Sequence, residues 1–231
     1  MRLLYSIVVA LGLAVPASAQ VWSQPFLQTG NNFSITTFVV ANDFTLTSST
    51  TLSSMRVWLA DRAQSGVLDG VANNFSGTLG WALYANSGGI PSTILFSGND
   101  VAASVTTTGL LSGTGREIFQ VDAVFSGAPV LTAGTYWLAL RDGTWGSASD
   151  GTVMGWQEAI STVGFDHAET ANVTNPGPWA SVAPDVAFEL YAVSVPEPTT
   201  IAMIAGLTLC GIGGYYYRRR QVIDANLTIS R

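Results

Sequence analysis

Side chains that commonly carry out catalysis are scarce in this chain of 231 residues. It has one histidine, His167, one cysteine, Cys210, and no lysine, since all nine basic residues are arginines. The absence of lysine excludes Schiff-base chemistry, pyridoxal phosphate anchoring and a phosphate-binding P-loop. A serine nucleophile would need His167 as its base, but residues 165–169 are expected to form an exposed loop and no Gly-x-Ser-x-Gly turn is present.

Carboxylates are the one catalytic group in good supply. Asp150, Glu158, Asp166 and Glu169 lie close together in the sequence, and glycoside hydrolases use two carboxylates. The usual pattern of two acids alternating along one strand is missing, which favours acids on a solvated loop. We therefore expect a protein without catalytic activity, with a sandwich-fold polysaccharide hydrolase as an alternative.

Oxygen-bearing side chains suggest calcium as a further alternative. Asp61 and Asp69 lie near Asn73 and Asn74 in one expected loop, and calcium takes carboxylate and carbonyl oxygens from such loops. The regular ligand spacing of an EF-hand is absent, so Asp61 and Asp69 are candidate ligands only. No organic cofactor is expected.

Seven tryptophans offer a different chemistry, because the apolar face of a sugar ring packs well on an aromatic ring. Trp145 and Trp179 lie in turn-like surroundings and are the best candidates for an exposed sugar-binding platform. The other interpretation is that most of these rings fill a core. Further candidate members of the platform are Trp58, Tyr84 and Trp156.

These residues must be positioned by strands, because apolar and polar residues alternate with a period of two along most of the chain. Gly and Asp-Gly turn signals separate the alternating segments, as at 69–70, 88–89, 113–115, 142–143 and 150–151. The pattern predicts an all-β fold, an antiparallel β-sandwich of jelly-roll type with half-buried strands. The clearest strands are expected at 55–59, 79–84, 119–125, 136–141 and 186–191, and weaker ones at 33–40, 44–47, 94–97 and 152–157.

The first nineteen residues have the features of a secretory signal peptide. Arg2 precedes an apolar run that Pro16 ends, and Ala17 and Ala19 are the small residues that signal peptidase needs before a cleavage site. Cleavage is expected between Ala19 and Gln20, which leaves a body of residues 20–194.

The other end of the chain has three successive elements. Val195, Pro196, Glu197 and Pro198 open a short motif of residues 195–200. Residues 201–217 form an apolar run that would rise about 25 Å as a helix, which is just enough to span a bilayer core. A cluster of arginines then acts as a stop-transfer signal, and a short cytoplasmic tail of residues 221–231 follows. The arginines are Arg218, Arg219 and Arg220.

Residues 195–220 resemble the PEP-CTERM sorting signal, which combines this motif, a short span and an arginine cluster. The resemblance implies processing by an exosortase-type transpeptidase in a Gram-negative bacterium that makes extracellular polysaccharide. Residues 41–46, 55–59, 81–84 and 134–140 also resemble strands of the generic β-sandwich bodies common in such proteins.

The sequence therefore predicts an exported protein rather than a nucleic-acid-binding one. Its body has thirteen acidic residues against four arginines, so its charge of −9 opposes phosphate binding. The precursor is expected in the inner membrane with its body in the periplasm, and the mature protein at the cell surface or in the exopolysaccharide matrix of a biofilm. A carbohydrate-binding module is the alternative function.

Overall fold

The long strand β4 (Thr50–Asp61) organises the first of two antiparallel sheets. It pairs with β14 and then β11 along one edge, and with β9 and β8 along the other. The remaining members extend the sheet from these neighbours. They are β1 (Ser18–Gln24), β2 (Asn32–Ser34), β7 (Ser104–Leu111), β8 (Glu117–Val124), β9 (Val130–Leu131), β11 (Met154–Gln157) and β14 (Phe188–Val193).

The second sheet has six strands in the order β13-β12-β3-β10-β5-β6. Its centre is β10 (Gly134–Asp142), which pairs with β3 on one side and β5 on the other. The other strands are β3 (Val39–Leu46), β5 (Leu79–Ser87), β6 (Ile90–Asp100), β12 (His167–Thr170) and β13 (Ala180–Val182).

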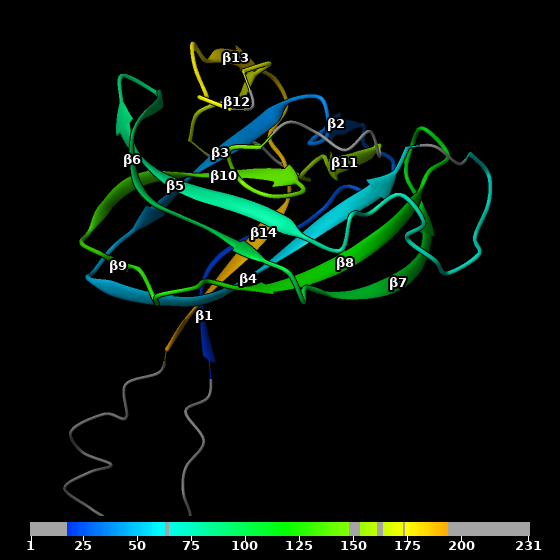
Figure 1. Ribbon diagram of the computed structural model, residues 1–231, viewed down its shortest axis with the longest axis horizontal. Helices are drawn as coiled ribbons and strands as arrows, with labels where there is room; N and C mark the ends of the chain where they lie inside the picture. The colour runs from blue at the N-terminus through cyan, green and yellow to red at the C-terminus, as the bar shows by residue number, and fades with distance from the viewer. Residues whose placement is uncertain (1–17, 63–64, 148–152, 161–163, 173, 194–231) are drawn as a thin grey trace, which may run out of the picture. The chain divides into compact units, whose positions relative to one another are not determined.

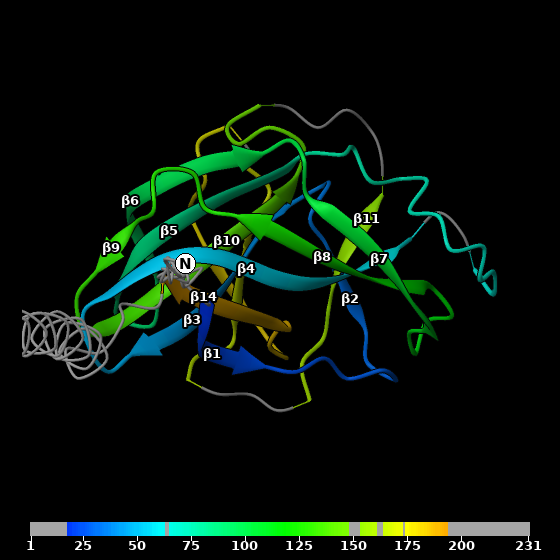
Figure 2. The same cartoon turned by 90° about the horizontal axis from the view of Figure 1, so that it is seen from below.

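This computed structural model describes residues 18–62, 65–147, 153–160, 164–172 and 174–193. Ser18–Val193 forms one compact unit. In Figure 1 the layer containing β3, β5 and β10 lies above the layer containing β4, β7 and β8. Figure 2 shows the eight-stranded sheet from below, with β1, β14, β4 and β8 in front. The expected all-β antiparallel sandwich is thus confirmed at the level of its two sheets.

Aromatic rings fill the space between the two sheets. Trp156 is fully buried, and its ring lies edge-on to Phe188 with centroids 5.8 Å apart. Trp81 meets Phe125 in the same way at 4.8 Å. Such edge-to-face pairs contribute about 0.5–1.5 kcal/mol each beyond the burial of their area. The Trp156 indole nitrogen also donates to the Ala187 carbonyl at 2.6 Å, so this large polar ring is satisfied inside the core.

The prediction of half-buried strands is wrong for the centre of the six-stranded sheet. Strands β3, β5 and β10 bury side chains on both faces over most of their length. The outer face carries a row of alanines that lie opposite one another in adjacent strands and have no exposed surface. Loops with large aromatic side chains cover this row, which is why the face is buried. The alanines are Ala168, Ala41, Ala139 and Ala82.

The positions of individual strands and turns were predicted only in part. The five clearest strand segments all lie in or overlap strands, and Gly88 and Gly89 join β5 to β6 with φ of 63° and 82°. The single strand predicted at 33–40 is wrong, because a turn separates β2 from β3 there. The sequence pattern does not predict β1, β7, β9, β12 or β13, and the turn expected at 150–151 lies outside the described residues.

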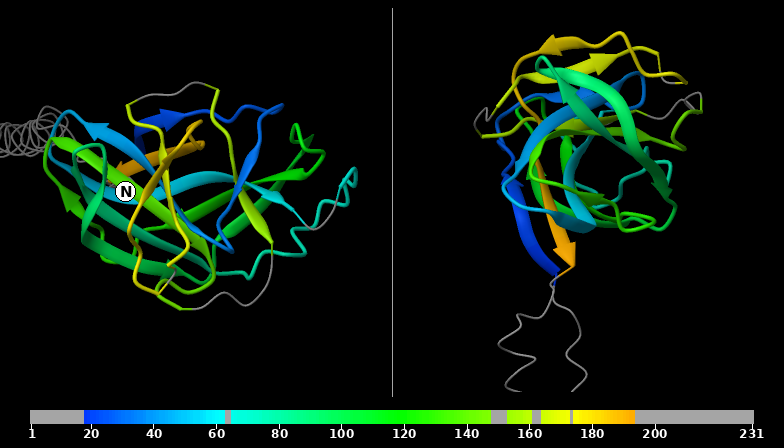
Figure 3. Two further views of the ribbon diagram at one scale, coloured as in Figure 1. Left: turned by 90° about the horizontal axis from the view of Figure 1, so that it is seen from above. Right: turned by 90° about the vertical axis from the view of Figure 1, so that its left-hand side faces the viewer.

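The two ends of the compact unit are neighbours. Ser18, the first residue of β1, is the cross-strand partner of Val193, the last residue of β14. The right-hand view of Figure 3 shows this pair of strands, blue and orange, side by side. The expected cleavage site between Ala19 and Gln20 lies within β1. The described part of the chain has no helix long and apolar enough to cross a membrane, and the expected span 201–217 lies outside it.

Candidate functional site

Five aromatic side chains gather on the outer side of the six-stranded sheet, and we term them the aromatic face. Buried Tyr84 and Trp137 are cross-strand partners in β5 and β10. The half-buried rings of Trp145 and Trp179 lie edge-on to Tyr84, with centroids 6.4 and 5.4 Å away. Phe165 stacks on Trp137 at 6.2 Å. The two predicted platform tryptophans thus come together on one tyrosine, although 34 positions separate them in the sequence.

Trp145 is held by the loop that follows β10. Its backbone N–H donates to Asn99 Oδ1 at 2.6 Å, and the buried guanidinium of Arg141 donates to the Ser147 carbonyl. The loop lies directly on Gly80 of β5, where an added Cβ would stand only 2.6 Å from the Gly143 oxygen. Any larger residue at position 80 would therefore push the Trp145 loop away from the sheet.

Trp179 is held by the loop between β12 and β13. The Thr170 hydroxyl accepts the backbone N–H groups of Asn172 and Gly177 at 3.3 and 3.2 Å, which folds the loop back on β12. Gly177 has a φ of 129°, which favours glycine, and the Gly177–Pro178 peptide bond is cis. Trp179 follows Pro178 and immediately precedes β13, and its ring lies over Tyr84.

The other two tryptophans of the predicted platform lie elsewhere. Trp58 packs against Phe26 at 5.2 Å in a separate buried cluster, and Trp156 is part of the core between the sheets. Membership of Trp58 and Trp156 in the platform is therefore wrong. The alternation of apolar and polar residues predicts which side chains of a strand are buried. It does not predict which face of a sheet a loop will cover, so it could not separate Trp58 and Trp156 from the two loop tryptophans.

His167 is not on an exposed loop as predicted. It belongs to β12, is fully buried and packs on Phe33 with ring centroids 4.2 Å apart. Its Nδ1 donates to the Pro184 carbonyl, and its Nε2 lies 3.4 Å from Glu169 Oε1. This segment is a strand because β12 pairs with β3 and with β13. The pairing places the His167 side chain inside the protein. These contacts are those of a core histidine.

Asp43 is a buried acid beside the aromatic face. It lies on β3 opposite Trp137, is 2% exposed, and accepts the Phe165 backbone N–H at 3.0 Å. Burial raises the pKa of Asp43 to about 6, the Phe165 N–H opposes this shift, and the nearby Asp185 carboxylate adds to it. Sequence reasoning missed this residue, although a charged side chain within the apolar strand 39–46 was a usable signal.

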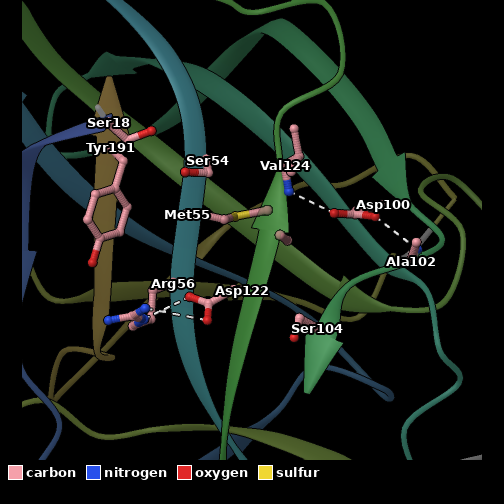
Figure 4. A pocket seen from close by; sticks show the side chains of 11 residues that line it. Ser18, Ser54, Met55, Arg56, Asp100, Ala102, Ser104, Asp122, Val124 and Tyr191 are labelled. Atoms are coloured by element: carbon pink, nitrogen blue, oxygen red, sulfur yellow. Dashed lines mark hydrogen bonds and ion pairs between the residues drawn. The ribbon is translucent and has the colours of Figure 1, made fainter. Parts of the chain in front are cut away.

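The eight-stranded sheet carries a hollow of about 420 Å³, lined mainly by β4 and β8, with Tyr191 of β14 on one side (Figure 4). Arg56 Nε lies 2.7 Å from Asp122 Oδ1, and its Nη1 lies 3.7 Å from Glu189 Oε2. The Arg56 guanidinium also lies 5.8 Å from the ring centre of Tyr191. The hollow thus contains a network of paired charges.

Two acids line this hollow, and both are engaged within the chain. Asp122 is paired with Arg56 and also accepts the Gln120 amide at 2.7 Å. Asp100 accepts the backbone N–H groups of Ala102 and Val124 at 2.9 and 2.7 Å. These bonds connect the β6–β7 link to β8, which gives both carboxylates a structural role.

The acids considered for hydrolysis are spread over different structures. Glu158 Oε2 accepts the Asn31 N–H at 2.7 Å, Asp166 is exposed, and Glu169 lies beside His167. None of these three lines the hollow, and Asp150 lies outside the described residues.

Asp61 and Asp69, the candidate calcium ligands, accept hydrogen bonds from groups of the chain. Both oxygens of Asp61 accept the Asn74 amide, at 2.7 and 2.9 Å. Asp69 accepts the Val71 N–H at 2.9 Å and the Asn73 amide at 3.1 Å. Among residues 18–193, wherever the structure describes them, no group of three or more His, Cys, Asp or Glu side chains is placed to hold a metal ion.

The residues of the sorting prediction fall largely outside the structure. Ala17, the motif 195–198 and the arginines 218–220 are not among the described residues, whereas Ala19 and Gln20 pair with Ala192 and Tyr191. Models of known protein families give no match to this chain, and neither do curated proteins.

Proposed function

We propose that this protein is an exported surface or matrix protein, delivered by a cleaved signal peptide and sorted by an exosortase-type transpeptidase. The observation that carries the proposal is the order of motif, apolar span and arginine cluster in residues 195–220, behind an N-terminal signal sequence. Its partners are signal peptidase, the inner membrane during sorting, and the exosortase. Its role is structural or adhesive rather than catalytic.

The position of the strand ends supports this proposal. Because Ser18 and Val193 are cross-strand partners, both export segments attach to the same end of one compact unit. Cleavage after Ala19 would remove only the first two residues of β1, which are exposed, and residues 20–193 keep the rest of both sheets and the core between them. A body of this design tolerates cleavage at both ends.

The test is processing in the native host. A variant with Pro196→Ala and Glu197→Ala should accumulate as a membrane-bound precursor, whereas Asp224→Ala in the tail should be processed normally. Mass spectrometry of the cell-surface and membrane fractions reads out both termini. A wild-type protein that keeps residues 201–231 and does not respond to loss of the exosortase contradicts the proposal.

We propose as a second function that the body binds exopolysaccharide through the aromatic face. Two half-buried tryptophans carried by separate loops meet at Tyr84, and aromatic rings of this kind stack on sugars. We also propose that the sandwich is of the jelly-roll type, as expected from the sequence, because this fold is common among carbohydrate-binding lectin domains.

Retention on purified host exopolysaccharide tests this second function. Trp145→Ala and Trp179→Ala should each weaken binding by about tenfold, which corresponds to about 1.4 kcal/mol, the upper range for one aromatic contact. Ile160→Ala is a matched control, because Ile160 is an exposed apolar side chain outside the aromatic face. Equal retention of all three variants and the wild type contradicts sugar binding at this site.

A further inference from the structure

The hydroxyl of Tyr84 is a buried polar group with no hydrogen-bond partner among the residues that the structure describes. The residue is 1% exposed, and burial raises the pKa of its phenol, which therefore stays neutral and keeps its proton for donation. Its cross-strand neighbour Trp137 differs, because the Trp137 indole nitrogen donates to Asn86 Oδ1 at 3.0 Å. A buried donor left unpaired is costly to the fold, and a ligand that supplied an acceptor would remove this cost.

The cover of Tyr84 consists of side chains on loops. Trp145 and Trp179 lie edge-on to its ring and are themselves half-buried. The Trp145 loop is fixed to the sheet through Asn99 and Arg141. Trp179 instead follows a loop whose described residues, 171, 172 and 174–178, are mostly exposed, and which is bonded to the Thr170 hydroxyl. Of the two rings, Trp179 is therefore the one whose side chain we expect to rotate away, with the loop's bonds to Thr170 and the sheet unchanged.

Beneath these rings the sheet carries small side chains. Four alanines in register, one from each of β12, β3, β10 and β5, form a floor of methyl groups beside the row of Trp137 and Tyr84. At about 4.8 Å between strands the floor spans about 14 Å. Trp145 and Trp179 pack against it. Displacement of Trp179 would open a trough with an apolar floor, aromatic walls and one hydroxyl donor.

We propose that this trough is the binding site for a neutral glycan chain, and that the Tyr84 hydroxyl donates a hydrogen bond to a sugar oxygen there. Trp179 moves aside and closes over the apolar face of the bound sugar. This inference rests on the proposed exopolysaccharide binding and specifies its ligand class. Uncharged sugars are favoured because the body carries a charge of −9 and Asp43 lies directly beside Trp137.

Binding of defined glycans to residues 18–193, a compact unit with its own core, tests the inference. The probes are hexasaccharides of β-1,4-glucan, β-1,3-glucan, β-1,4-xylan and β-1,4-mannan, with oligogalacturonate as the anionic comparison. At least one neutral probe should bind more tightly than the anionic one. Tyr84→Phe should weaken that binding by tenfold or more, whereas Tyr136→Phe, which removes a hydroxyl bonded to the Thr132 carbonyl, should leave it unchanged.

The melting temperature of each variant shows whether weaker binding results from a lost contact or from misfolding. Tyr84→Phe removes an unpaired hydroxyl and keeps the ring, so the variant should melt at the wild-type temperature or above it. If Tyr84→Phe binds like wild type while Trp145→Ala and Trp179→Ala bind weakly, the role of Tyr84 is overturned and sugar binding stands. If no glycan binds the wild type, or the tryptophan variants bind normally, both proposals fail.

Discussion

Asp43 shows how one residue can link the aromatic face to solution conditions. Its carboxyl group lies under the loop of Phe165, and Gly164 approaches so closely that an added Cβ would stand 2.2 Å from Asp43 Oδ2. Because the carboxylate is buried, its charged form is disfavoured in the folded protein. A loop that contributes to the aromatic face is therefore held by an acid that titrates near pH 6.

This environment predicts a pH-dependent stability with a defined sign. The folded pKa of Asp43, about 6, lies above its ordinary value of 3.8, so folding is favoured by protonation. The protonated Asp43 side chain stabilises the folded protein below about pH 4, and this stabilisation is lost as the pH rises through 6. Asp43→Asn keeps an acceptor for the Phe165 N–H and should stabilise the body by up to about 2–3 kcal/mol at pH 7.5, with little effect at pH 4.

Urea unfolding at pH 4 and pH 7.5 measures this difference. Asp166→Asn serves as the control, because Asp166 is an exposed acid one position beyond the same loop contact. A wild-type free energy of unfolding that does not fall relative to Asp43→Asn over this range would show that Asp43 is not desolvated.

At the scale of elements, β1 connects the export prediction to the fold. Its first two residues, Ser18 and Ala19, are exposed, whereas Gln24 at its end is buried. The Gln24 amide donates to Asp185 Oδ2 at 2.8 Å, and the Asn42 amide donates to Gln24 Oε1 at 3.0 Å. The part of β1 that stabilises the sandwich thus lies beyond the expected cleavage site.

Truncation tests this reading of β1. A body that begins at Gln20 should melt within about 1 °C of one that begins at Ser18, because only exposed residues are lost. A body that begins at Pro25 should melt at least about 8 °C lower, since it loses the buried Gln24 bonds and the partly buried Trp22. Marked destabilisation of the Gln20 form would argue against cleavage at Ala19.

Across the whole molecule, the two faces of the sandwich differ in chemistry. The eight-stranded sheet places paired charges around Arg56, and ion pairs that are partly exposed in this way contribute little to stability. The six-stranded sheet places alanines and large aromatic rings on its outer side. A sugar chain bound to the aromatic face would therefore leave the charged face and the strand ends at Ser18 and Val193 free. Such an arrangement suits a protein that is sorted at one end and adheres with one face.

Much of the fold could be predicted from local patterns. Alternation at 55–59, 79–84 and 136–141 located central strands, because one face of each strand packs in the core between the sheets. For β5 and β10 the pattern found the strand but mispredicted its burial, because both faces are covered, and it missed the short strand β12 with its buried His167. At the site, Trp145, Trp179 and Tyr84 were recognised as candidates from the sequence. Asp43 was missed, because its burial depends on the loop of Phe165 that covers it.

The sequence by itself determined the chemistry that is missing, the antiparallel β class, and the predicted export segments at both ends. These properties depend on composition and short-range order, which folding does not change. Only the tertiary structure decided that Trp145 and Trp179 meet over Tyr84, that Trp156 belongs to the core, and that Ser18 lies beside Val193. Each of these is a contact between distant segments, set by strand order and by the loops that cover a sheet face.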